Sequence, residues 1–208
     1  MAHYADIYES WARAPEAFWE EAAKAIDWEA PWEKVLDWQG AGATWFKGAR
    51  CNTAYNCLDR HVEAGRGEAV ALIYDSPVTG KKKQFTYAQL TEKVARFAAV
   101  LQRHGVKKGE RVIIYMPMVP QAVVAMLACA RIGAIHSVVF GGFAAKELAT
   151  RIDDARPKLI VSASCGIEPG RTVSYKPLLD EAIALSAHKP DGCIIFQRER
   201  EKAELIPG

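Results

Sequence analysis

The fold of this chain is decided by residues 110–143, which read Glu110-Arg-Val-Ile-Ile-Tyr-Met-Pro-Met-Val-Pro-Gln-Ala-Val-Val-Ala-Met-Leu-Ala-Cys-Ala-Arg-Ile-Gly-Ala-Ile-His-Ser-Val-Val-Phe-Gly-Gly-Phe143. Residues 112–116 form an apolar run that predicts a buried strand. Pro120 suits the first turn of a helix, and Gly133 suits its end. Residues 135–140 predict the next strand. The stretch therefore predicts a βαβ unit that ends in a loop with little side-chain bulk.

The same alternation extends along the chain on both sides of this unit. Further helices are predicted over residues 86–104, 144–154 and 175–187, and further strands over residues 158–162 and 193–197. Before them, residues 70–74 and 84–87 predict a β-hairpin with its turn at residues 75–80. Thr86 and Gln89 have the spacing of a capping box. Long crossovers predict parallel strands with right-handed connections, and continuous apolar strands indicate a sheet covered on both faces. The predicted fold class is α/β, a parallel sheet flanked by helices.

The first 60 residues have a different composition. All six tryptophans lie between Trp11 and Trp45. A helix is expected to begin at Pro15, and the tryptophans after it lie among Pro and Gly residues. We therefore expect residues 1–60 to form an irregular, Trp-rich helical arm that anchors its rings on another surface. Residues 61–208 would form the α/β domain.

Composition excludes several classes of function. The net charge of this 208-residue chain is only +2, from 27 basic and 25 acidic residues, which gives no electrostatic case for nucleic acid or an anionic membrane. The start of the chain lacks the pattern of a secretory signal, and the longest nearly apolar stretch, residues 119–130, is too short to span a bilayer. Five cysteines without paired spacing predict free thiols, no metal site and a cytoplasmic location.

Two segments are candidates for binding, because ligands collect beyond the carboxyl ends of parallel strands. In the first segment, Gly141 and Gly142 would let a ligand approach the backbone, and Phe140 and Phe143 could flank a planar ring. The alternative is a strand-to-helix turn that needs positive φ and has two core phenylalanines. The neighbouring His136 is interpreted as a core or strand-end histidine.

The second candidate segment is the predicted loop over residues 162–171. This loop could hold a phosphate through Ser162, Ser164, Gly166, Gly170 and Arg171, since Arg is the natural forked donor for that group. Glu168 works against a purely anionic ligand. The alternative interpretation is a solvated loop with a surface arginine.

The residues of this region resemble one enzyme family. Residues 115–143 resemble the short-chain acyl-CoA synthetases of the adenylate-forming (AMP-binding) superfamily. Residues 28–61 are similar to the region that precedes the adenylating domain in acetyl- and propionyl-CoA synthetases. Residues 144–157 and 162–180 look more like propionyl-CoA synthetase, that is, propionate–CoA ligase. In acetyl enzymes an arginine usually stands where this chain has Glu168.

The resemblance implies an activity and a set of contacts. Phe140, Gly141 and Gly142 would border the adenine of CoA, and Arg171 would meet its phosphate. The implied enzyme is an acid–thiol ligase that joins propionate or another short-chain acid to ATP and then to CoA, with Mg²⁺. The phosphate loop, the ATP and Mg²⁺ sites, the catalytic residues and the mobile carboxyl-terminal domain of the family are not found in this sequence.

We therefore expect an amino-terminal fragment, inactive alone, whose further partner is the missing carboxyl-terminal part. Two alternatives remain open at this point. One is a fragment of an acetate–CoA ligase, and the other is a non-catalytic CoA- or nucleotide-binding module.

Overall fold

The computed structural model describes residues 3–205, and the chain divides after Asn56 into two compact units. The first unit contains helices α1 (Tyr4–Arg13) and α2 (Pro15–Ala23) and strands β1 (Lys34–Gln39) and β2 (Gly42–Lys47). The predicted helix at Pro15 is confirmed. The prediction of an irregular arm is wrong, because β1 and β2 pair as an antiparallel hairpin. Its turn uses Gly40 at φ +65°, and the mixture of Trp with polar residues conceals the strand pattern.

Aromatic rings pack against one another inside the first unit. The ring centroids of Trp28 and Trp32 lie 5.5 Å apart, and Phe46 lies 5.4 Å and 5.3 Å from them. The indole nitrogen of Trp28 donates a hydrogen bond to the carbonyl of Ala23, at 2.9 Å. These contacts give the rings partners within their own unit and tie the hairpin region to the end of α2.

The second unit is built on a parallel sheet with the strand order β10-β7-β5-β6. Its strands are β5 (Arg111–Met116), β6 (Ile135–Phe140), β7 (Leu159–Ala163) and β10 (Gly192–Phe196). Every pairing between them is parallel, which confirms the predicted α/β class. Each crossover contains a helix because parallel neighbours cannot be joined by a tight turn.

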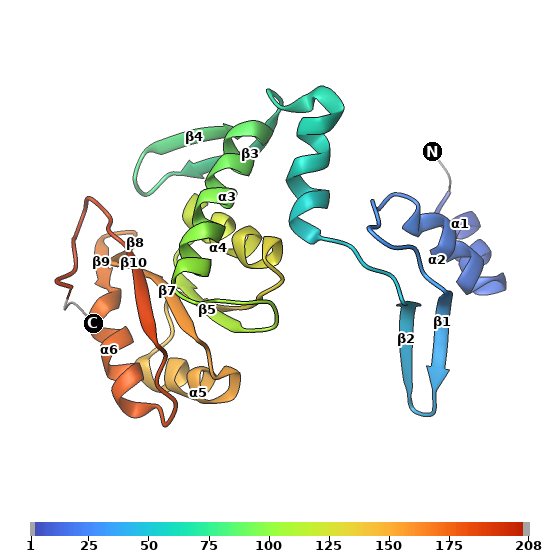
Figure 1. Ribbon diagram of the computed structural model, residues 1–208. Helices are drawn as coiled ribbons and strands as arrows, with labels where there is room; N and C mark the ends of the chain where they lie inside the picture. Colours follow the sequence, from blue (N-terminus) through green and yellow to red (C-terminus); the bar gives the residue numbers. More distant parts are fainter. Residues whose placement is uncertain (1–2, 206–208) are drawn as a thin grey trace. The chain divides into compact units, whose positions relative to one another are not determined.

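Helices cover the two faces of this sheet in pairs (Figure 1). Helices α3 (Tyr87–Arg103) and α4 (Pro120–Arg131) pack on one face, against a core that includes Val112 and Ile114. Helices α5 (Ala145–Ala155) and α6 (Tyr175–Leu185) pack on the other face, against Ile113 and Tyr115. Successive side chains of β5 therefore enter opposite cores, as the period of two in a strand requires.

The outer strand β6 departs from the expectation of full coverage. Ile135, Val138 and Phe140 are more than half exposed, and His136 is exposed as well. Of the two interpretations of His136, the core position is wrong and the strand-end position is confirmed, because His136 is the second residue of β6. The reason is topological: β6 ends the sheet in the described part of the chain, so no further strand covers its outer side.

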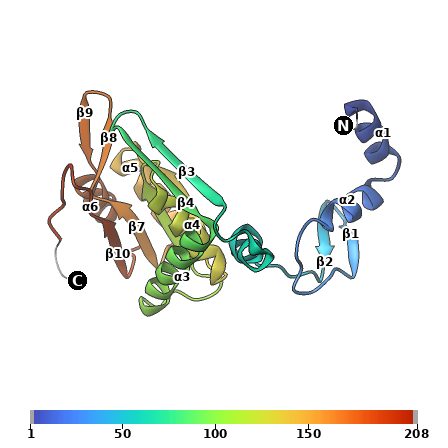
Figure 2. The same cartoon turned by 90° about the horizontal axis from the view of Figure 1, so that it is seen from above.

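Two antiparallel hairpins complete the second unit. Strand β3 (Val70–Ser76) pairs with β4 (Lys81–Thr86), and β8 (Cys165–Glu168) pairs with β9 (Arg171–Ser174). The β8–β9 hairpin lies beside the turn of the β3–β4 hairpin (Figure 2). Thr86 caps α3 with the predicted box: its hydroxyl accepts from the Gln89 amide at 3.3 Å, and the Gln89 side chain accepts from the Thr86 amide at 3.2 Å.

Two short π-helices, Tyr55–Asp59 and Val62–Arg66, precede the β3–β4 hairpin. Sequence patterns did not predict them. Both carboxylate oxygens of Asp59 accept hydrogen bonds from the Arg131 guanidinium at 2.7 Å, which ties this region to the end of α4.

Candidate functional site

The two candidate segments leave the sheet at the same edge. Met116 lies opposite Phe140 in the pairing of β5 with β6, and Tyr115 lies opposite Ser162 in the pairing of β5 with β7. Because these strands run in the same direction, the segments after Phe140 and after Ser162 both emerge at the carboxyl edge, where ligands bind in sheets of this type. The predicted placement of the two segments is confirmed.

A tyrosine that sequence reasoning did not select lies between the two segments. The Tyr175 ring packs against both Gly141 and Gly166, so that a Cβ atom at either glycine would collide with the phenol group. A Cβ atom at Gly166 would lie 2.7 Å from the Tyr175 hydroxyl. A Cβ atom at Gly141 would collide with the same hydroxyl and would lie 2.9 Å from the carbonyl oxygen of Met116. These glycines are thus required by the close approach of a ring.

This geometry corrects the alternative interpretation of the glycine pair. Neither Gly141 nor Gly142 has a positive φ, so the turn does not depend on the left-handed conformation. Gly141 is buried against Tyr175, whereas Gly142 is exposed. A Cβ atom added at Gly142 would approach only the Phe140 ring, at 2.9 Å. Of the two, Gly142 is the glycine past which a ligand could reach the backbone.

A pair of stacked tyrosines, Tyr115 and Tyr175, packs next to the carboxyl edge of the sheet. The rings of Tyr115 and Tyr175 lie 5.0 Å apart with an angle of 29° between their planes. The Tyr115 hydroxyl donates to the carbonyl oxygen of Phe143 at 3.0 Å, which holds the loop after β6. Burial raises the pKa of Tyr175 to about 12, and the pKa of Tyr115 is raised for the same reason. Both phenols are therefore neutral at physiological pH.

Phe140 is a surface residue, so the expectation of two core phenylalanines is wrong. The ring is 71% exposed because it ends the outer strand. Phe140 and Phe143 meet edge to face, with centroids 5.8 Å apart and planes at 63°. Since the rings touch each other, they cannot flank a planar ligand from both sides as expected. The exposed face of Phe140 alone is open to stacking.

The second candidate segment is a hairpin and not a loop, and its serines have structural partners. The buried Ser162 hydroxyl donates to the carbonyl of Tyr115 at 2.8 Å. The buried Ser164 hydroxyl donates to the carbonyl of Glu201 at 2.6 Å and accepts from the Arg198 amide at 2.8 Å. The prediction that these two hydroxyls hold a phosphate is therefore wrong.

Arg171 lies on the exposed side of the β8–β9 hairpin. Its Nε donates to the Glu168 carboxylate at 2.6 Å, across the strand pair. This pair is solvent-exposed and worth little in stability, but it offsets the charge that Arg171 offers to an anion. The prediction that Glu168 opposes anion binding thus has a direct structural cause.

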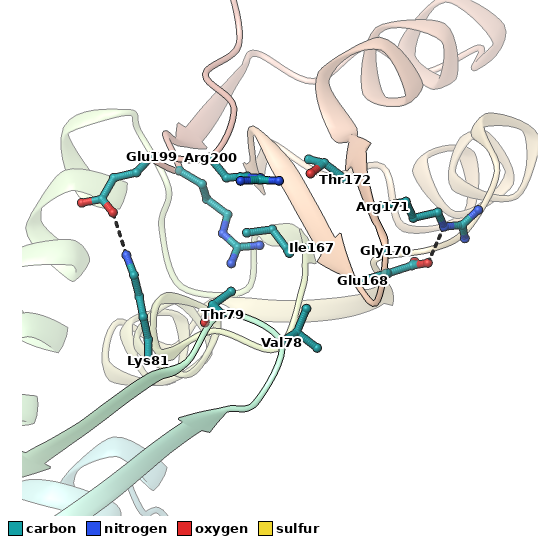
Figure 3. Close-up of a pocket in the computed structure, with 11 residues that line it drawn as sticks. Val78, Thr79, Lys81, Ile167, Glu168, Gly170, Arg171, Thr172, Glu199 and Arg200 are labelled. Atoms are coloured by element: carbon teal, nitrogen blue, oxygen red, sulfur yellow. Dashed lines mark hydrogen bonds and ion pairs between the residues drawn. The ribbon is translucent and has the colours of Figure 1, made fainter.

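A pocket that sequence reasoning missed lies next to the β8–β9 hairpin. It has a volume of about 620 Å³ and is bounded by the turn of the β3–β4 hairpin, by the β8–β9 hairpin and by residues 198–200 (Figure 3). Its cations include Lys81, Arg198 and Arg200. The sequence feature that could have indicated this pocket is the run of basic and acidic residues at 198–202, after the last strand. Such a run is typical of a solvated tail.

Residues 3–205 contain no group of three or more His, Cys, Asp or Glu side chains that could hold a metal ion. In the same described range no helix is long and apolar enough to cross a membrane.

The fold and the carboxyl edge together define an α/β protein of the kind that binds small molecules at strand ends. Residues 58–206 match the family model described as AMP-binding enzyme, and residues 4–57 match the model described as acetyl-coenzyme A synthetase N-terminus. The chain belongs to the AMP-binding enzyme family.

Individual relatives agree with this assignment. The chain is 55% identical over 196 residues to the mitochondrial acyl-CoA synthetase short-chain family member 3 of Bos taurus, covering 93% of this chain and 29% of the relative. It is 45% identical over 206 residues to the propionate–CoA ligase of Salmonella typhimurium, covering 99% and 33%. The acetoacetyl-CoA synthetase structure from Streptomyces lividans matches 94% of this chain and 32% of its own, with a TM-score of 0.81 and 26% identity. The chain thus spans about a third of the length of these relatives.

Proposed function

We propose that this chain forms part of an ATP-dependent short-chain acyl-CoA synthetase that activates propionate, and that its carboxyl edge forms one wall of the CoA site. Family membership and the similarity to a propionate–CoA ligase support the reaction. The observation that carries the site is the position of Tyr175, whose ring joins the β6 tip and the β8–β9 hairpin into one surface. A cytoplasmic location stays a prediction.

The proposed reaction has two steps. A carboxylate oxygen of the acid attacks the α-phosphorus of ATP, and the bond to the departing pyrophosphate breaks. The CoA sulfur then attacks the acyl carbonyl carbon, and the carbon–oxygen bond to AMP breaks. Mg²⁺ would supply charge stabilisation at phosphorus. The family's phosphate loop is not found in this sequence, so this chain would contribute binding surface to the reaction.

Each predicted CoA contact has a defined role in this proposal. The open face of Phe140 would stack on the adenine, and the exposed backbone at Gly142 would allow the base to approach closely. Gly141 would act indirectly, by giving room to Tyr175. Arg171 would meet a CoA phosphate, at the cost of its ion pair with Glu168, which predicts a weaker phosphate contact than an unpaired arginine would make.

The activity can be tested on a protein of the relatives' length that contains this chain. With ATP and CoA we expect propionyl-CoA and AMP to form, with a higher kcat/KM for propionate than for acetate. Separation of the thioesters by chromatography measures both. A preference for acetate would favour the acetate–CoA ligase alternative, which the match of residues 4–57 to the acetyl-coenzyme A synthetase model supports. Absence of any thioester would exclude the ligase activity and leave a non-catalytic binding module.

Replacing Gly142 with tryptophan in that protein should raise the KM for CoA by about tenfold or more, since each factor of ten corresponds to about 1.4 kcal/mol of lost binding. The added ring would cover the backbone beside Phe140. The KM for ATP in the adenylation step, measured by pyrophosphate exchange without CoA, should change little. An unchanged requirement for CoA would remove the glycine from the proposed site.

A further inference from the structure

The pocket beside the β8–β9 hairpin is framed by fixed contacts within the second unit. Residues 198–201 form a tight turn, closed by a bridge between Arg198 and Glu201. The buried Ser164 hydroxyl bonds to both ends of this turn. Farther along, the Gln197 side chain bonds twice to the backbone of Ala203, at 2.8 and 2.9 Å. The wall that carries Arg198 and Arg200 is therefore anchored to the sheet.

The charges that line the pocket do not cancel. Its cations are Lys81, Arg171, Arg198 and Arg200, and its anions are Glu168 and Glu199. Glu199 pairs with Lys81 at 2.6 Å, and Glu168 pairs with Arg171 at 2.6 Å. Among the residues that line the pocket, the guanidinium groups of Arg198 and Arg200 thus remain without a carboxylate partner.

The two remaining arginines differ in how they are held. One nitrogen of Arg198 donates to the carbonyl of Cys165 at 3.1 Å, which orients the group and leaves its other donors available. The guanidinium of Arg200 has no polar partner among the described residues and extends toward the β8–β9 hairpin near Thr172 (Figure 3). Arg171, by contrast, is directed away from the pocket.

We propose that this pocket binds a phosphorylated small molecule, whose phosphate oxygens accept hydrogen bonds from Arg198 and Arg200. The forked guanidinium matches phosphate oxygens, and about 620 Å³ is enough for a molecule much larger than a bare phosphate. The pocket shares Arg171 with the proposed CoA wall, but Phe140, Gly141 and Gly142 do not line it. The inference goes beyond that wall because it assigns the phosphate contacts to Arg198 and Arg200.

The local field is consistent with an anion site. The hydrogen bond and charge of Lys81 hold the pKa of Glu199 below its usual value, and the charges of Lys83 and Lys202 act in the same direction. Glu199 therefore stays ionised at neutral pH and keeps Lys81 engaged. The excess positive charge remains with the two arginines.

The test is titration calorimetry of the 208-residue chain with inorganic pyrophosphate at low ionic strength, where screening is weak. We expect saturable binding that Arg200→Gln weakens by about tenfold or more, since it removes a charge-assisted donor. Lys202→Gln is the matched control: this exposed residue lies two positions away, outside the pocket, and its loss changes the net charge equally. It should change the affinity by less than about twofold.

Three results would overturn the proposal. One is no saturable binding of pyrophosphate at millimolar concentration. Another is equal weakening by Arg200→Gln and Lys202→Gln, which would indicate a diffuse charge effect. The third is citrate binding as tightly as pyrophosphate, which would exclude a preference for phosphate. Gly142→Trp should leave pyrophosphate binding unchanged, so this test is independent of the proposed CoA contact.

Discussion

Replacing Tyr175 with alanine should lower the free energy of unfolding of the second unit by about 3–5 kcal/mol, the usual cost of removing a buried aromatic ring. Tyr175 is only 5% exposed. Its ring stacks on Tyr115 and fills the space beside Gly141 and Gly166. Neither glycine has a side chain that could move into the resulting cavity, so the surrounding residues should fill little of it. Urea unfolding of the whole chain, followed by circular dichroism, measures the change.

Tyr175→Phe is the matched control for that substitution. It keeps the ring and removes only the hydroxyl, so we expect a loss of no more than about 1 kcal/mol. The alanine variant should also speed hydrogen exchange at the backbone amides of the loop after β6 and of the β8–β9 hairpin, because the ring joins these two segments. If the two variants unfold at the same urea concentration, the ring does not hold the carboxyl edge together.

Replacing Gly141 with alanine should cost about 2–3 kcal/mol through overpacking. The added Cβ would collide with the Tyr175 phenol and would lie 2.9 Å from the carbonyl oxygen of Met116, which belongs to the central strand and cannot move freely. Thermal unfolding should show a clearly lower Tm.

Gly142→Ala provides the comparison one residue farther along the chain. Its Cβ would meet only the exposed Phe140 ring, which can rotate aside, so the expected cost is below about 1 kcal/mol. Equal losses for the two variants would contradict the assignment of separate roles, in which Gly141 makes room for Tyr175 and Gly142 is open to a ligand. The combination Gly141→Ala with Tyr175→Phe should recover part of the loss, because it removes the nearest clashing atom.

Local signals in the sequence predicted the sheet and its helices well. Helix α4 is bracketed by Pro120 and Gly133, and α3 begins with a capping box between Thr86 and Gln89. Such signals act within a few residues, so a single sequence displays them. Sequence patterns did not predict the hairpin β1–β2 or the short π-helices. Both segments mix aromatic, polar and small residues without a clear period.

The sequence by itself determined the class of fold, the alternation of strands and helices along the chain, and the two segments at the carboxyl edge. Only the tertiary structure decided what those segments do. It buried the hydroxyls of Ser162 and Ser164 in structural bonds, paired Arg171 with Glu168, and placed Tyr175 against Gly141. It also brought Lys81 beside Glu199, which lies 118 residues away in the sequence. Periodicity reports which face of an element is buried, whereas partners from distant segments are set by how those elements pack.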